Sequence, residues 1–362
     1  MYIPSLDGIR ALAFLLVFIA HAGLDNIVPG GFGVTIFFFL SGYLITSILR
    51  LEASRTHRIS LRQFYLRRAF RILPPMYLAL AMAYLLGHAG LLQETGNVFG
   101  LLAASFYFYN YADLLHVHAI LPSGTGVLWS LMVEEHFYFA FPLAYLLFVR
   151  GKTPVRNQVI VLLGFCFAAL LWRFSLVYLV RTPLTTLPRW TYSASDARFD
   201  SILLGCILAI RDNAWFGDRS TLLRRFRGIF ASFGIILILA SLIFREPHFR
   251  ETVRYTLQSI SLYPIFFYCT STSHQWQVHW LEWKPLRWLG LVSYSMYLVH
   301  LIPLSIGRQW FPSHLILVAM FSFAISLAYS WAIRVLVEQP SRRWRHYLEM
   351  KLARPAEGVV GE

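Results

Sequence analysis

A histidine and an arginine lie eleven positions apart in the first apolar segment of the chain. The segment reads SLDGIRALAFLLVFIAH and contains Arg10 and His21. An ionisable side chain inside a bilayer costs about 2.5–3.5 kcal/mol, so it usually has a partner and a function. Eleven helical steps of about 100° return to nearly the same face. We therefore predict that Arg10 lies at the cytoplasmic rim and that His21 is a general base near the bilayer centre. The alternative is a histidine that only hydrogen-bonds a neighbouring helix.

Two adjacent carboxylates, Glu134 and Glu135, form the second charged group in an apolar segment. They occur in LWSLMVEEHFYFAFPL, at a predicted depth of roughly 12 Å below the outer surface of the membrane. This depth is comparable with that predicted for His21. A carboxylate raises the basicity of a histidine beside it. Neighbouring helical positions differ by about 100°, so we expect one glutamate to orient His21 and the other to bond elsewhere. The alternative is a structural ion pair with an intramembrane arginine, for which Arg173 is a candidate.

Three arginines cluster before the third apolar segment, in FYLRRAFRILPPMY. Arg68 and Arg71 are one helical turn apart, and Arg67 precedes them. Guanidinium groups bind phosphate through two parallel hydrogen bonds. The cluster could therefore hold a nucleotide-phosphate carrier such as coenzyme A. A topology signal, or contact with anionic lipid head groups, is the alternative.

A second membrane histidine, His300, occurs in SYSMYLVHLIP with Tyr297 one turn earlier. We expect the two on one helical face, and a substrate contact and a structural role both stay open. The sequence has no Walker motif, no G-x-S-x-G and no metal-ligand spacing, and its three cysteines lie in apolar runs. We predict no metal and no permanently bound cofactor.

The composition indicates how these side chains are positioned. The chain is 57% hydrophobic and 14% charged, against about 25% charged in soluble domains. Many apolar runs approach the roughly 20 residues that cross a bilayer. We predict an all-α polytopic membrane helix bundle with about ten transmembrane helices, of which the sixth is short and partly buried. The predicted spans are 10–28, 32–49, 72–92, 127–149, 158–180, 199–210, 228–244, 255–272, 288–306 and 314–336.

The charge distribution orients this bundle. The net charge is +14, but the basic residues lie between apolar spans, as the positive-inside rule predicts, so we expect no nucleic-acid partner. Basic loops follow the second, fourth and sixth spans and the last one, whereas residues 93–126 contain no Lys or Arg. We therefore expect both termini in the cytoplasm. The stretch 98–111 is too short to cross alone, and we interpret it as re-entrant or interfacial.

Six strings in this order resemble acyltransferase family 3, membrane enzymes that O-acylate bacterial glycans and other acceptors. SLDGIRALAFLLVFIAH and GGFGVTIFFFLSGYLIT resemble the first two helices, and RRAFRILPPMY contains an R-x-x-R string. LWSLMVEEHFY, with Trp129 and Ser130, LGLVSYSMYLVHLIP and the closing VEQP complete the set. Two positions depart from the family pattern, because Thr35 replaces an aspartate and His136 replaces a glutamine. The first departure puts a catalytic role at position 35 in doubt, and the second would alter acceptor contacts.

The resemblance implies a family 3 domain at residues 1–340 and a basic cytoplasmic tail at 341–362. It implies the membrane-only form, without a following esterase-like domain, in the bacterial inner membrane. It also implies an acyl-CoA donor, often acetyl-CoA, and functional roles for the Arg10–His21 pair and the R-x-x-R arginines. Trp129 and Ser130 are candidates for substrate contact or polar structure. A glycan, a lipid-linked sugar or another hydroxyl compound would be the acceptor, and a homo-oligomer is left open.

A transporter is the alternative class, since intramembrane His, Arg and Glu also line ion pathways. A carrier often shows repeat symmetry between its halves, and this sequence has none that we detect.

Overall fold

The computed structural model describes residues 2–213, 215–216, 220–271 and 276–345, and the regular structure within these ranges is entirely helical. The predicted tail beyond residue 345 lies outside the described residues. The chain forms two compact units. The first comprises Met1–Ile59, Gly96–Leu121 and Gly126–Ser293, and the second comprises Ser60–Thr95, Pro122–Thr125 and Tyr294–Glu362.

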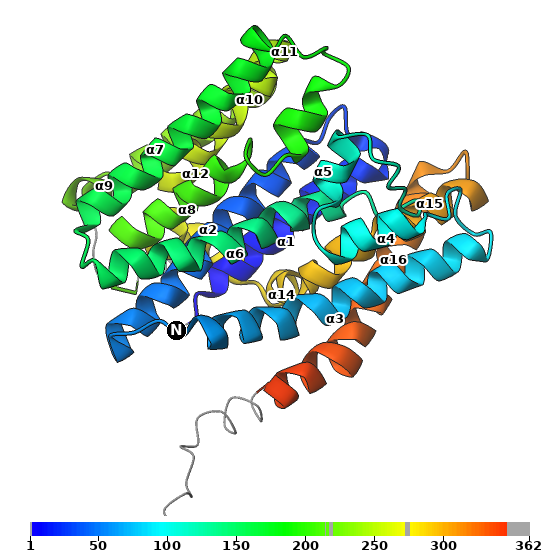
Figure 1. The fold of residues 1–362 in the computed structure, drawn as a ribbon, viewed down its shortest axis with the longest axis horizontal. Coiled ribbons are helices and arrows are strands. Elements are labelled where there is room, and N and C mark those ends of the chain that lie inside the picture. The colour runs from blue at the N-terminus through cyan, green and yellow to red at the C-terminus, as the bar shows by residue number, and fades with distance from the viewer. Residues whose placement is uncertain (1, 214, 217–219, 272–275, 346–362) are drawn as a thin grey trace, which may run out of the picture. The chain divides into compact units, whose positions relative to one another are not determined.

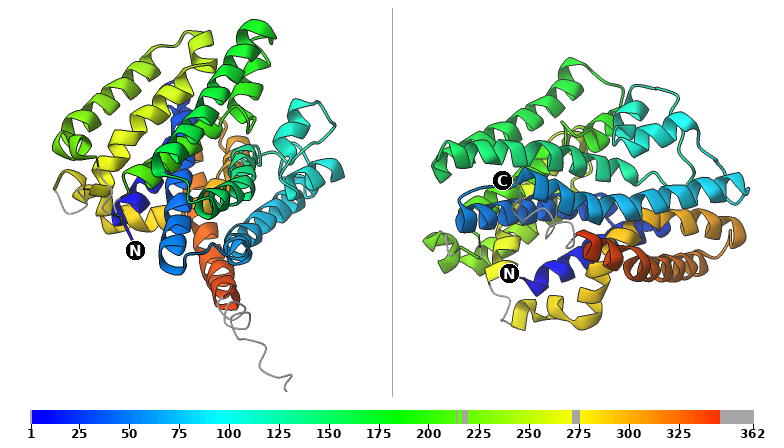
Figure 2. Two further views of the ribbon diagram at one scale, coloured as in Figure 1. Left: turned by 60° about the vertical axis from the view of Figure 1, so that its left-hand side comes forward. Right: turned by 60° about the horizontal axis from the view of Figure 1, so that its bottom comes forward.

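Seven long helices build the first unit (Figure 1). Helix α2 packs against both α1 and α8, α7 and α12 pack against α8, and α10 packs against α12. The left view of Figure 2 shows α10 and α12 side by side. The seventh helix, α6, packs against α2. The bounds are α1 Pro4–Ile19, α2 Gly30–Thr56, α6 Leu128–Arg150, α7 Val155–Phe174, α8 Phe199–Arg211, α10 Arg227–Ile243 and α12 Arg254–Ser271.

Short elements connect these helices. The apolar stretch expected to be re-entrant or interfacial consists of two short helices, α4 and α5, separated by Tyr107 at φ 63°. Asn97 caps α4 by accepting a hydrogen bond from the Gly100 backbone N–H at 2.7 Å. The remaining bounds are α4 Val98–Ser105, α5 Tyr109–Leu114, α9 Thr221–Arg225, α11 Pro247–Glu251, α13 Trp276–His279, the π-helical turns η1 Ala20–Leu24, η2 Ser175–Leu179 and η3 Arg189–Ser193, and the 3-10 turn η4 Trp280–Glu282.

A reciprocal glycine contact joins α2 to α8. A Cβ added at Gly42 would lie 1.9 Å from the Ile202 carbonyl oxygen, and one added at Gly205 would lie 2.0 Å from the Phe39 carbonyl oxygen. Small residues at helix interfaces let backbones approach closely in membrane proteins. Residues 200–210 of α8 are all buried, so this short helix lies inside the first unit.

The second unit is built around α3, Leu61–His88, and the C-terminal helices. Ser60 caps α3 by accepting a hydrogen bond from the Gln63 backbone N–H. The π-helical turn η5 packs against α3, and α15 packs against α16. The helix that contains α16 and η5 continues to Arg345. The remaining bounds are α14 Lys284–Val299, whose last residues belong to this unit, α15 Leu301–Trp310, α16 Leu315–Ile333 and η5 Arg334–Glu338.

Six helices among the described residues are long and apolar enough to cross a membrane. A seventh candidate is the pair α14 and α15, which bends by 63°. The chain is therefore a multi-pass membrane protein, as its composition predicted. The predicted spans 199–210 and 228–244 correspond to α8 and α10, which have only 13 and 17 residues. The six spans are Pro4–Leu24, Gly30–Thr56, Leu61–His88, Leu128–Arg150, Val155–Leu179 and Leu315–Arg345.

The predicted ninth span is not one straight helix, because it breaks at His300 between α14 and α15. Pro303 follows three residues later and has no N–H to donate to the Val299 carbonyl. The loss of this hydrogen bond accounts for the break.

Candidate functional site

His21 lies in the π-helical turn η1 at the end of the first span. The sequence predicted His21 at the centre of this span. The span begins at Pro4 rather than at Arg10 and ends at Leu24, so His21 is instead close to its C-terminal end. Gly23 ends the regular helix with φ 118°. The imidazole side chain is half-buried. Isolated π-helical turns occur frequently at functional sites.

Arg10 belongs to a charged cluster at the other end of α1. Its Nη1 lies 3.2 Å from the Oδ1 of Asp7, which is buried. The Tyr2 hydroxyl donates to the second oxygen of Asp7, and Arg287 donates to the Tyr2 hydroxyl at 3.1 Å. Burial and the neighbouring Asp7 carboxylate raise the pKa of Tyr2. Asp7 holds Arg10, and the sequence reasoning did not identify this carboxylate as a partner.

Glu134 is held by two hydroxyl groups. Its Oε2 accepts hydrogen bonds from Ser41 at 3.0 Å and from Tyr138 at 2.6 Å. The two hydroxyl oxygens are themselves 2.9 Å apart. Glu134 and Glu135 are both half-buried on α6. The two hydroxyl groups fix the orientation of the Glu134 side chain.

Arg173 pairs with Asp200 and not with a glutamate of α6, so it is not the arginine partner considered for Glu134 and Glu135. Its Nη2 lies 2.7 Å from Asp200 Oδ2, and both side chains are fully buried. Arg173 also donates to the Thr252 carbonyl at 2.8 Å, to the Ala197 carbonyl and to the Thr256 hydroxyl. Its three nitrogen atoms are therefore all engaged by the core of the first unit.

A second buried arginine, Arg198, contacts Thr35, one of the two positions that depart from the family pattern. Its Nη2 donates to the Thr35 hydroxyl at 3.0 Å. Its guanidinium lies 4.0 Å from the ring centroid of Tyr255 and 5.2 Å from that of Tyr192. Within the described part of the chain, its Nε and Nη1 have no hydrogen-bond partner. Trp129 packs against Tyr192, with ring centroids 4.5 Å apart.

His136, the other position that departs from the family pattern, contacts a buried serine. Its Nδ1 lies 2.6 Å from Ser195 Oγ, and Ser195 also accepts a hydrogen bond from the Asn110 amide at 3.3 Å. The adjacent Tyr111 hydroxyl donates to Asp196 at 2.6 Å. Burial and this hydrogen bond raise the pKa of Tyr111 to about 12.

His300 lies fully buried at the break between α14 and α15. Its Nδ1 is 2.8 Å from the Tyr297 carbonyl oxygen, and the two rings are 5.6 Å apart. The Ser130 hydroxyl donates to the Val127 carbonyl at 3.0 Å and is buried. These contacts fit structural roles, and the substrate contacts considered for His300, Tyr297 and Ser130 stay predictions.

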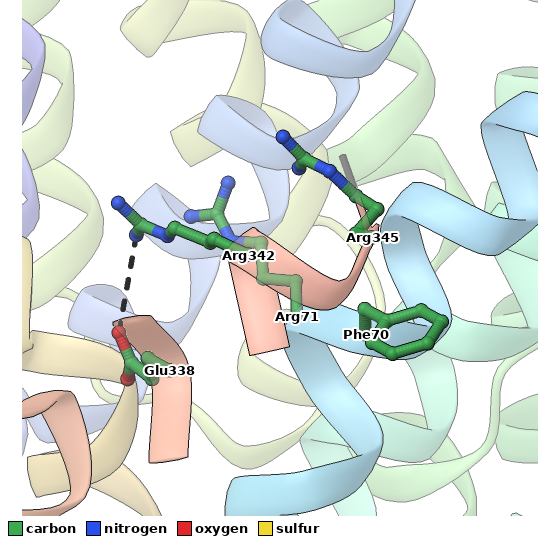
Figure 3. A pocket seen from close by; sticks show the side chains of 5 residues that line it. All are labelled: Phe70, Arg71, Glu338, Arg342 and Arg345. Carbon is green, nitrogen blue, oxygen red and sulfur yellow. Dashed lines mark ion pairs between the residues drawn. The ribbon is translucent and has the colours of Figure 1, made fainter. Parts of the chain in front are cut away.

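Arg71 lines a pocket of about 310 Å³ in the second unit, together with Phe70, Glu338, Arg342 and Arg345 (Figure 3). Arg342 Nη2 lies 3.9 Å from the Glu338 carboxylate. Arg68 does not line this pocket, and its guanidinium lies 5.8 Å from the Phe64 ring centroid. Arg67 lies half-buried on the same helix.

Sequence reasoning singled out His21, Arg10, Glu134 and Arg71 but missed most of the groups that hold them. Asp7 lies three residues before Arg10, and this spacing was a signal that could have revealed it. Ser41 is 93 residues away from Glu134, so no local pattern links the two. No group of three or more His, Cys, Asp or Glu suited to a metal ion occurs among the described residues.

A multi-pass bundle of apolar helices is the architecture that the family resemblance implies. The chain belongs to acyltransferase family 3, because the family model described as an acyltransferase domain matches residues 3–335.

Two similar proteins have names that specify peptidoglycan. The peptidoglycan O-acetyltransferase OatA of Listeria monocytogenes is 30% identical over 313 residues, which are 83% of this chain and 49% of that protein. The putative peptidoglycan O-acetyltransferase YrhL of Bacillus subtilis is 32% identical over 320 residues, covering 83% of this chain and 48% of that protein. The chain spans about half the length of the curated relatives that it matches.

The O-acetyltransferase OatA of Staphylococcus aureus is 29% identical over 317 residues, which are 83% of this chain and 50% of that protein. No solved structure matches the chain.

Proposed function

We propose that this protein is an integral membrane O-acyltransferase that moves an acetyl group from acetyl-CoA to a hydroxyl group of a glycan. The observation that carries the proposal is the family match over residues 3–335, combined with the half-buried His21 in an irregular turn of the first span. The names of the relatives favour peptidoglycan or a related cell-wall glycan as the acceptor.

The proposed topology has ten spans, both termini in the cytoplasm and a location in the bacterial inner membrane. Its support is the six candidate spans, the bent pair α14–α15 and the basic loops on one predicted side. The short helices α8 and α10 and the longer α12 would supply the remaining three spans.

In the proposed reaction, His21 accepts the proton of the acceptor hydroxyl group as its oxygen attacks the thioester carbonyl carbon. The new C–O bond forms while the C–S bond breaks, and the departing coenzyme A thiolate takes the proton from the His21 imidazolium, which restores the neutral base. A two-step variant has His21 as the nucleophile, with an acyl-imidazole intermediate that the acceptor then attacks. Glu134 or Glu135 would stabilise the imidazolium. Glu134 is suited to this role because Ser41 and Tyr138 hold its carboxylate in one orientation.

The proposed donor site uses the arginines of α3. Arg71 lines an arginine-rich pocket, and Arg67 and Arg68 precede it on the same helix. Arg10 is proposed to support the donor as well, with its guanidinium held by Asp7.

The test is acetyl transfer by the purified protein in nanodiscs, with acetyl-CoA and a glycan acceptor, read out by product mass. His21→Ala should lower the rate by about 100-fold or more, since general base catalysis typically contributes 10²–10⁴-fold. His279→Ala is the matched control, because that side chain is 77% exposed, and it should keep the wild-type rate. A His21→Ala rate within about threefold of wild type would refute the base role.

Product mass also separates the proposal from a carrier. Acetylated acceptor supports the enzyme, whereas an unmodified solute that crosses the membrane would establish the transporter.

A further inference from the structure

The arginine pocket of the second unit joins two segments that are far apart in the sequence. Arg71 and Phe70 come from α3, whereas Arg342 and Arg345 come from the helix that follows η5 (Figure 3). Arg342 and Arg345 are three residues apart, so they lie one turn apart on one helical face. Arg343 lies between them, is exposed and does not line the pocket.

The pocket has a net positive charge. Its lining carries three guanidinium groups and one carboxylate, that of Glu338. Glu338 accepts a hydrogen bond from Ser295 at 2.9 Å, and its distance of 3.9 Å from Arg342 is that of a loose ion pair. Among the described residues that line the pocket, guanidinium groups outnumber carboxylates by three to one, so the pocket favours an anion.

Planar guanidinium forks match the geometry of phosphate oxygens and bind them through paired hydrogen bonds. The cavity of about 310 Å³ is at the lower end of ligand pockets, which run from about 300 to 1,000 Å³. It therefore suits the phosphate-bearing end of a nucleotide rather than a whole coenzyme A molecule.

A hydrogen bond inside the second unit and two prolines determine the backbone of α3 beside the pocket. The Tyr294 hydroxyl donates to the Ile72 carbonyl at 3.0 Å, directly after Arg71. Pro74 and Pro75 lie inside α3 and have no N–H to donate to the carbonyl groups of Phe70 and Arg71. Both pocket residues on α3 thus lie in a turn that lacks two of its helical hydrogen bonds.

We propose that Arg342 and Arg345 complete a phosphate-binding site with Arg71, and that this site binds the phosphate groups of the nucleotide acyl donor. The inference rests on the proposed function for the identity of the donor. It assigns a binding role to the basic residues at the C-terminal end of the last span, which the positive-inside rule alone treats as a topology signal.

The experiment measures the affinity of adenosine 3′,5′-bisphosphate for the full chain in nanodiscs of phosphatidylcholine. Arg342→Gln and Arg345→Gln should each weaken binding by about tenfold or more, because a lost hydrogen bond to a charged group is worth that much. Arg343→Gln removes the same charge from the same helix outside the pocket and should change the affinity by less than about twofold. Equal affinities in all three variants and wild type, or equal losses in all three variants, would overturn the proposal.

Two further variants separate phosphate binding from a structural role. If Arg342 only pairs with Glu338, then Glu338→Gln and Arg342→Gln should weaken binding equally, which would refute the proposal. If Arg342 binds phosphate, Glu338→Gln removes a repulsive charge and should bind the probe at least as tightly as wild type. Arg342→Lys, which keeps the charge but not the fork, should fall between wild type and Arg342→Gln.

The same chemistry could recognise a lipid phosphate, so a second arm uses nanodiscs that contain phosphatidylglycerol. Unchanged nucleotide affinity in Arg342→Gln, combined with weaker retention of phosphatidylglycerol, would show a lipid head-group site and overturn the donor assignment.

The His21→Ala variant should bind the probe like wild type. Arginine-dependent probe binding without acetyl transfer from acetyl-CoA would refute the proposed function while leaving the phosphate site intact.

Discussion

Asp200→Asn should strongly destabilise the first unit, because it removes the charge that pairs with Arg173. The carboxylate lies 2.7 Å from the guanidinium, and both side chains are fully buried. Thr256 also donates to the same oxygen of Asp200. The asparagine keeps the shape of the side chain but leaves the Arg173 charge uncompensated in the core.

The expected cost is about 3–5 kcal/mol, the usual range when one partner of a buried ion pair is removed. About 1.5–3 kcal/mol of this is the lost hydrogen bond between charged groups, and the rest is the unpaired charge. The pair Arg189–Asp113 supplies the matched control, since its atoms are 4.0 Å apart and its side chains are 54% and 44% exposed. Asp113→Asn should cost less than about 1 kcal/mol.

The assay is equilibrium unfolding of both variants in mixed micelles, followed by tryptophan fluorescence. The single variant Arg173→Met and the double variant that combines it with Asp200→Asn complete a double-mutant cycle. The coupling energy between the two positions should exceed about 1.5 kcal/mol. An Asp200→Asn cost no larger than that of Asp113→Asn would refute the reasoning. So would additive effects in the double variant.

Three further predictions follow from contacts inside the first unit. Gly205→Ala should destabilise the protein by about 1–3 kcal/mol in thermal unfolding, because the new Cβ would lie 2.0 Å from a carbonyl oxygen of α2. Ser41→Ala removes one hydroxyl donor from Glu134 and should lower kcat/KM by roughly tenfold if that carboxylate supports catalysis. Thr35→Asp places a carboxylate beside the buried Arg198 and should stabilise the protein by about 1–2 kcal/mol, because charged hydrogen bonds are stronger than neutral ones.

A different result would refute each of these three predictions. Gly164 is an exposed helical glycine with no atom near an added Cβ, so Gly164→Ala should be neutral or stabilising, and an equal loss in both glycine variants would rule out the steric explanation. An unchanged kcat/KM in Ser41→Ala would remove Glu134 from the proposed mechanism. Lower stability in Thr35→Asp would show that Arg198 does not need a counter-charge.

The helical elements could be predicted because each depends on local sequence. Apolar runs in a weakly charged chain predicted membrane helices, and each predicted span overlaps a helix of the structure. The start of the first helix was wrong by six residues, because Pro4 at its first position was not recognised as a helix start. Because the span also ends at Leu24 rather than at residue 28, His21 lies in its last turn and not at its centre.

The partners of the site residues could not be predicted, since they depend on the tertiary fold. Asp200 was included in a predicted span, but only the packing of α7 against α8 shows that it pairs with Arg173. Arg71 was predicted to act with Arg68 because the two are neighbours in sequence. In the structure the arginines that share its pocket are Arg342 and Arg345, and no periodicity links segments so far apart.

The glycine contact between α2 and α8 also limits how this protein can evolve. In most helix interfaces, a larger side chain on one helix can be accommodated by a smaller one on the other. Gly42 and Gly205 each face a backbone carbonyl group of the opposite helix, and neither the carbonyl nor glycine itself can be made smaller. A gain of volume at either position therefore has no reciprocal suppressor, and any second-site revertant must move the helix axis through substitutions elsewhere.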